Sequence, residues 1–151
     1  MISMKSIVAV LFLMLLMSGS SSAQTYEKFD GFGDVNCEDE MAHLDNFAVQ
    51  LQHEPQMIGY IMVYGGQRRK HGDPKARASR MKDYLTRNRG VDAKRVVTII
   101  GGYREQVEVE LLIWPAGVGL PQASPTVQKK NVKYISGRIS RDQYHHCGGM
   151  Y

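Results

Sequence analysis

The sequence predicts a two-layer α+β domain in which two helices cover one face of a mixed sheet. Short apolar segments typical of strands alternate with two longer segments of helical periodicity, in the order β-α-β-α-β-β. Helices that connect buried strands imply parallel crossovers, and two final strands joined by a tight turn imply an antiparallel hairpin. The length of 151 residues, with 43% hydrophobic and 23% charged residues, fits one globular domain.

Residues 1–23 have the features of a secretory signal peptide. A lysine precedes an apolar run over residues 7–17, and the small residues Ser21 and Ala23 precede the expected cleavage before Gln24. A membrane anchor is the alternative, but a helix over this run rises only about 16 Å, against about 30 Å of hydrocarbon. We therefore expect a protein exported to the periplasm or the extracellular space, with no membrane span after cleavage.

The first strand and the first helix are expected between residue 24 and Pro55. Aromatic residues among glycines indicate a short strand within residues 24–35. Asn36 is a typical N-cap, and residues 38–40 place three carboxylates beside the positive end of the helix dipole. Pro55 ends the helix because the residue before a proline disfavours helical geometry. The inner stripe of this helix is Met41, Leu44, Ala48 and Leu51.

The middle of the sequence predicts a buried strand and a second helix. Residues 57–64 form a continuous apolar run, as in a strand buried on both faces, and two glycines end it. Asp73 and Pro74 are the expected N-cap and first residue of the helix, and Gly90 is the expected residue after its end. The inner stripe of this helix is Ala78, Met81 and Leu85.

Two further strands complete the domain, which we expect to span residues 24–115. Residues 96–100 are all β-branched, and residues 107–114 largely alternate between apolar and acidic side chains until Pro115. Prolines and glycines then predict a linker over residues 116–130, followed by a C-terminal tail over residues 131–151.

The tail has two interpretations. Residues 131–140 either form a short hairpin around Gly137 or have no regular structure. We expect a disulfide between Cys37 and Cys147, because an exported chain meets an oxidising compartment. This bond would tether the tail to the start of the first helix and stabilise the fold by about 4–5 kcal/mol in the chain-entropy account. Two unpaired thiols are the alternative.

Catalytic and metal-binding functions have little support in the sequence. It contains no Gly-x-Ser-x-Gly elbow, no His-Glu-x-x-His helix and no Walker loop, so we expect no enzymatic activity. His145, His146 and Cys147 make a poor metal site, because adjacent histidines point in different directions and no second cluster has ligand spacing. We therefore expect neither a bound metal nor another cofactor.

Residues 26–115 resemble the peptidoglycan-associating domain of the outer-membrane protein A (OmpA-like) family. The resemblance lies in the order and spacing of several segments: Lys28-Phe29-Asp30, Val63-Tyr64-Gly65, residues 77–85, residues 90–96 and residues 107–110. That family holds the zwitterionic peptide stem of peptidoglycan between an Asp after the second strand and an Arg early in the second helix. Arg77 matches the family's Arg, whereas the turn at residues 65–69 has no Asp. The resemblance therefore implies the fold and half of the binding pair.

Positive charge takes the place of the missing carboxylate. The sequence predicts a ligand-binding surface at Arg68, Arg69, Arg77 and Arg80, near the positive end of the second helix dipole. The expected partner is peptidoglycan or another anionic envelope component, such as lipid phosphates or an acidic envelope protein. One alternative is a solvated cationic surface without a ligand, and another is a scaffold subunit of an envelope assembly that docks through its tail. Nucleic acid is a poor partner for an exported protein.

Overall fold

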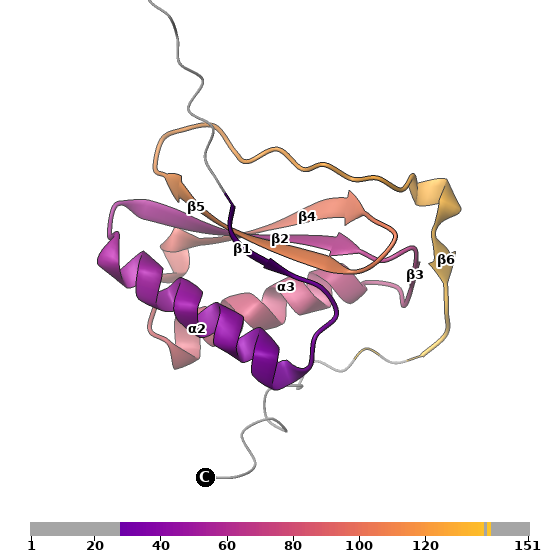
Figure 1. Ribbon diagram of the computed structural model, residues 1–151, viewed down its shortest axis with the longest axis horizontal. Helices are drawn as coiled ribbons and strands as arrows, with labels where there is room; N and C mark the ends of the chain where they lie inside the picture. The colour runs from indigo at the N-terminus through magenta and orange to yellow at the C-terminus, as the bar shows by residue number, and fades with distance from the viewer. Residues whose placement is uncertain (1–27, 138, 140–151) are drawn as a thin grey trace, which may run out of the picture.

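A mixed sheet of four strands forms the centre of the molecule (Figure 1), in a computed structural model that describes residues 28–137 and 139. The strand order is β1-β5-β2-β4. β2 pairs in parallel with β4 and antiparallel with β5, and β5 pairs antiparallel with β1. The predicted two-layer α+β class is confirmed by this sheet and its two helices. The strands are β1 (Lys28–Phe32), β2 (Met57–Gly65), β4 (Val96–Tyr103) and β5 (Glu108–Pro115).

The predicted hairpin between the last two strands is wrong, because β2 lies between β4 and β5. The connection from β4 to β5 instead crosses the end of β2. Arg104 N donates to Gly65 O at 3.0 Å, and Gln67 N donates to Glu105 O at 3.1 Å. Gly66 permits this crossing, since a Cβ there would meet Val107 N at 3.1 Å. An apolar strand such as β2 gains a partner on both edges by this arrangement.

Both helices pack on the same face of the sheet (Figure 1). They are α2 (Cys37–His53) and α3 (Asp73–Asp83), and a π-helical turn over Tyr84–Asn88 continues α3. The core between the layers includes Leu44, Phe47 and Leu51 of α2, Ala78 and Met81 of α3, and Ile61 and Val63 of β2. The apolar stripes predicted from helical spacing therefore face the sheet.

The helix ends agree with the sequence in two places and differ in one. Asn36 caps α2 as predicted, because its side chain accepts a hydrogen bond from Asp39 N at 2.9 Å. Gly90 has a φ of 69°, the left-handed conformation expected after a helix. The predicted cap at Asp73 is wrong, since Gly72 with a φ of 75° is the N-cap and Asp73 is already helical. A left-handed N-cap suits glycine, which has no Cβ.

The opposite face of the sheet is covered by the chain that follows β5. Residues 116–127, which we call the strap, run across this face in an extended path (Figure 1, orange). Pro121 is buried, and Trp114 Nε1 donates to Gly119 O at 2.6 Å. Beneath the strap lies a second apolar cluster that includes Tyr60, Met62, Tyr64 and Leu112. Most of the segment predicted as a linker is thus laid along the sheet.

Several predictions fall outside the described residues. These are the signal peptide over residues 1–23, the cysteine at position 147 and the histidines at 145 and 146. Cys37 is disulfide-bonded, and Cys147 is the only other cysteine in the sequence. Across residues 28–137 and 139, no helix has the length and hydrophobicity needed to cross a bilayer.

Candidate anion-binding site

A second, two-stranded sheet lies beside the end of β2. It consists of β3 (Arg68–Arg69) and β6 (Lys133–Tyr134), which run in parallel, and we call it the basic mini-sheet. Lys133 N donates to Gln67 O at 2.7 Å, and Ile135 N donates to Arg69 O at 2.9 Å. The tail therefore returns to the loop that follows β2, although more than sixty residues separate them in sequence.

Like charges face one another across the basic mini-sheet. Arg68 is directly opposite Lys133, and both are exposed. Lys129 and Lys130 precede β6 in a short 3₁₀ helix (Lys129–Asn131). The ion pairs formed among the described residues involve neither Arg68 nor Lys133. Like charges directly opposite one another destabilise a strand pair, so a bound anion would relieve this arrangement.

Arg69 is the central residue of the mini-sheet. Only 6% of the residue is exposed, and its Nε and Nη1 have no hydrogen-bond partner among the described residues. Its Cζ lies 5.0 Å from the ring centroid of Tyr103 and 5.9 Å from that of Tyr134. Buried charges in proteins are normally paired, and an unpaired one costs several kcal/mol. The two aromatic rings offset only part of this cost.

Neighbouring residues fix the position of the Arg69 side chain. A Cβ at Gly65 would lie 1.8 Å from Arg69 Nη1, so only glycine fits at that position of β2. The ring of Tyr134 stacks on that of His71, with centroids 3.7 Å apart and an interplanar angle of 4°. The hydroxyls of Tyr103 and Tyr134 lie 3.5 Å apart, and this hydrogen bond raises the pKa of Tyr134. Tyr134 thus lies beside Arg69, with its ring stacked on His71 and its hydroxyl against that of Tyr103.

Arg77 and Arg80 lie in a different cluster. Arg77 Nη1 lies 3.0 Å from Glu40 Oε2, and Arg80 Nη2 lies 2.9 Å from Glu40 Oε1. Glu40 is only 2% exposed, and Arg77 also pairs with Asp34. The structure therefore brings Arg68 and Arg69 together in the mini-sheet, whereas Arg77 and Arg80 join α3 to α2.

The carboxylate of Glu40 was not recognised as buried from the sequence, where it was interpreted as a partner of the helix dipole. A signal was present in the spacing, because Glu40 precedes Leu44 by four residues and Phe47 by seven. These three residues share the buried side of α2. A glutamate on the buried face of one helix predicts a partner of opposite charge on the helix packed beside it.

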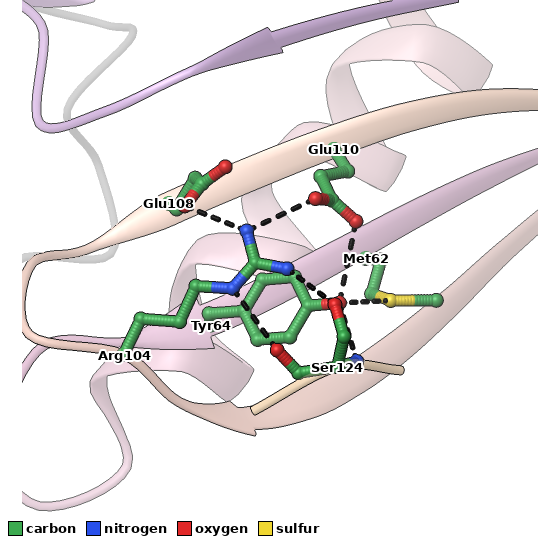
Figure 2. Close-up of polar contacts among 6 residues, drawn as sticks. All are labelled: Met62, Tyr64, Arg104, Glu108, Glu110 and Ser124. Atoms are coloured by element: carbon green, nitrogen blue, oxygen red, sulfur yellow. Dashed lines mark hydrogen bonds and ion pairs between the residues drawn. The ribbon is translucent and has the colours of Figure 1, made fainter. Parts of the chain in front are cut away.

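A third polar cluster joins the strap to the sheet (Figure 2). Arg104 Nη1 lies 2.6 Å from Glu108 Oε2 and 3.0 Å from Glu110 Oε1, and Arg104 Nη2 donates to Ser124 Oγ at 2.8 Å. The guanidinium lies over the ring of Tyr64, with 3.6 Å between Cζ and the centroid. Burial lowers the pKa of Arg104, but its hydrogen bonds to the two glutamates outweigh this and raise it overall.

The hydroxyl of Tyr64 completes the cluster. It lies 2.9 Å from Met62 Sδ and 3.2 Å from Glu110 Oε2, and it accepts a hydrogen bond from Ser124 N at 3.1 Å (Figure 2). Tyr64 and Ser124 are sixty residues apart, so no local pattern predicts this contact. Because Arg104 pairs with both glutamates and also bonds to the strap, the cluster has a structural role.

Comparisons with known proteins do not assign the chain to a family. No model of a known protein family matches it, and no curated protein matches it. The resemblance to OmpA-like domains therefore stays a prediction. Among the residues that the structure describes, no group of three or more His, Cys, Asp or Glu side chains could hold a metal ion.

Proposed function

We propose that this protein is an exported, non-catalytic module of the cell envelope that binds the carboxylates of peptidoglycan through the basic mini-sheet. The single observation that supports this proposal most strongly is Arg69, whose buried guanidinium has two nitrogens without a partner among the described residues. A guanidinium matches a carboxylate in shape and charge and binds it with paired hydrogen bonds. Peptidoglycan carries carboxylates on its peptide stems.

The surroundings of Arg69 favour a polymer over a small inorganic anion. Arg68, Lys129, Lys130 and Lys133 extend the positive charge along the mini-sheet, so several anionic groups can be attracted at once. Tyr103 of β4 adds an aromatic ring, which provides flat apolar surface beside the charges. Hydrogen bonds to a charged group contribute about 1.5–3 kcal/mol each, enough for useful affinity when several form.

Co-sedimentation with insoluble peptidoglycan tests the proposal. The wild-type chain should pellet with peptidoglycan at low salt and less at high salt, because salt screens exposed charges. Arg69→Gln should lose this retention. Arg87→Gln is the matched control, because it removes the same charge from a residue outside the mini-sheet. The side chain of Arg87 is 79% exposed.

Three results would contradict the proposal. These are no retention of the wild type, equal retention of the Arg69→Gln variant, and preferential binding to vesicles that contain anionic lipid. The last result would assign the mini-sheet to lipid phosphates instead of carboxylates. Thermal unfolding of both variants tests whether a loss of retention comes from loss of the fold.

A further inference from the structure

The basic mini-sheet is closed as it stands in the structure. Arg69 Nε and Nη1 are buried, and the ring of Tyr134 lies over the guanidinium. Tyr134 belongs to β6, so the tail of the chain covers the group that the proposed function needs. Tyr103 of β4 and Gly65 of β2 also lie against the guanidinium, so β6 is one part of its cover. β6 has the shortest strand pairing of these parts, so its movement gives a carboxylate access most easily.

The strand pairing of β6 is short, although the ring of Tyr134 stacks on that of His71 and Gln67 Nε2 donates to Asn131 O at 3.4 Å just before β6. β6 pairs through two residues only, with Arg68 opposite Lys133 in the same register. The strap, in contrast, is held at Ser124 by Arg104 and Tyr64, and at its end Thr126 N and Val127 N both donate to Tyr103 O at 3.0 Å. The chain between these two attachments is the 3₁₀ helix Lys129–Asn131.

We propose that β6 is a gate that inhibits ligand binding at Arg69 in the closed state and separates from β3 when the ligand binds. This inference rests on the proposed function, because it concerns access to the same site. The strap stays in place, and the chain bends at the 3₁₀ helix that connects it to β6. The ligand carboxylate then replaces the ring of Tyr134 at the guanidinium. In the closed state the repulsion between Arg68 and Lys133 already favours separation.

Population arithmetic gives the size of the expected effect. The apparent affinity of a site that is open only part of the time is lowered by the open fraction. If about one molecule in ten is open, a variant that is always open binds about tenfold more tightly. A ligand that binds only the open state also increases the open fraction of the wild type.

The test compares two proline variants for binding to soluble peptidoglycan fragments. Ile135→Pro removes the amide that donates to Arg69 O and should release β6, so its binding should be about tenfold tighter than that of the wild type. Ser136→Pro is the matched control, because the amide of Ser136 makes no backbone hydrogen bond to the described residues. Its affinity should equal that of the wild type.

Hydrogen exchange of the wild-type chain gives a second measurement that needs no variant. Addition of the fragments should speed the exchange of the amides of Lys133 and Ile135, since both lose their acceptors when the gate opens. Slower exchange on binding overturns the gate, as does equal or weaker binding by Ile135→Pro. If neither the wild type nor Ile135→Pro binds, the proposed function fails and the gate fails with it. Wild-type binding without an effect of Ile135→Pro refutes the gate alone.

Discussion

Glu40 lies in the first turn of α2 with its carboxylate buried between two arginines of α3. Glu40→Gln should lower the free energy of unfolding by about 3–5 kcal/mol, because it removes the buried carboxylate charge that Arg77 and Arg80 share, while Arg77 keeps its pair with the exposed Asp34. Denaturant unfolding measures this change. Glu38→Gln is the control, since Glu38 is an exposed carboxylate in the same turn. An equal loss in both variants would show that the helix dipole, and not the buried pair, accounts for the effect.

Tyr84 gives a prediction about alkaline pH. Burial raises the pKa of Tyr84, the hydrogen bond to Asp45 raises it further, and contacts with Arg89 offset these effects only in part. The neutral phenol is thus favoured in the fold, and its stabilisation is complete below the ordinary tyrosine pKa of about 10. It is lost as the pH rises through the raised value.

The measurement is the difference in unfolding free energy between the wild type and Tyr84→Phe. At neutral pH the variant should be less stable by about 1 kcal/mol, because it lacks the hydroxyl that lies 2.7 Å from Asp45 Oδ1. Above about pH 10 this difference should shrink. A difference that stays constant across this range would contradict the account.

At the scale of elements, Gly59 sets the distance between β2 and α2. A Cβ at this position would lie 2.6 Å from Leu51 Cδ1 and 3.0 Å from Phe47 Cζ. Gly59→Ala should therefore push the helix away from the sheet and cost about 1–3 kcal/mol, as other overpacking substitutions do. Urea unfolding of Gly59→Ala and Gly33→Ala makes the comparison, since a Cβ at Gly33 meets only Val107 O at 3.6 Å. Similar losses in the two variants would contradict close packing at Gly59.

Helices and buried strands were predictable because each follows from a local pattern. The cap at Asn36 and the apolar stripes of α2 and α3 depend on residues within a few turns of one another. The position of β5 between β1 and β2 was not predictable, because alternation along a strand does not specify its neighbours in the sheet. Nothing in the two residues of β3 or of β6 marks them as strands either.

In the candidate site, too, local sequence features were predictable and contacts between distant segments were not. Positive charge in the sequence identified Arg68 and Arg69, and the structure places both in the mini-sheet. The same reasoning included Arg77 and Arg80, because a charge count does not reveal that a buried glutamate faces them. Lys133 and Tyr134 were missed, since only the path of the chain over the sheet brings them to β3.

At the scale of the whole molecule, Arg104 fastens the strap across the sheet (Figure 2). Arg104→Met should release residues 116–127, because it removes the bonds to Ser124 and leaves Glu108 and Glu110 side by side without a counter-charge. The expected loss is about 1–3 kcal/mol, because the three charged side chains are only partly buried and solvent screens their interaction.

Fluorescence of Trp114, the single tryptophan, reports on this release. Its indole nitrogen donates to Gly119 of the strap, so detachment should shift the emission to longer wavelength and make the strap sensitive to proteases. Arg87→Met is the control, because Arg87 lies far from the strap in sequence and has an exposed side chain. An unchanged emission in Arg104→Met would show that apolar packing alone holds the strap.

The strand order β1-β5-β2-β4 also has a consequence for how the chain acquires its structure. β1 and β2 appear early in the sequence, yet the strand that joins them, β5, is the last strand of this sheet to be synthesised. A nascent chain that ends at Tyr103 has β1 without a partner and one open edge on β2. Closing the long loop from β1 to β5 costs chain entropy. This cost is offset only when β5 pairs with both β1 and β2. Folding of the sheet should therefore wait for Pro115, which leaves the growing polypeptide unfolded until about three quarters of it has been synthesised.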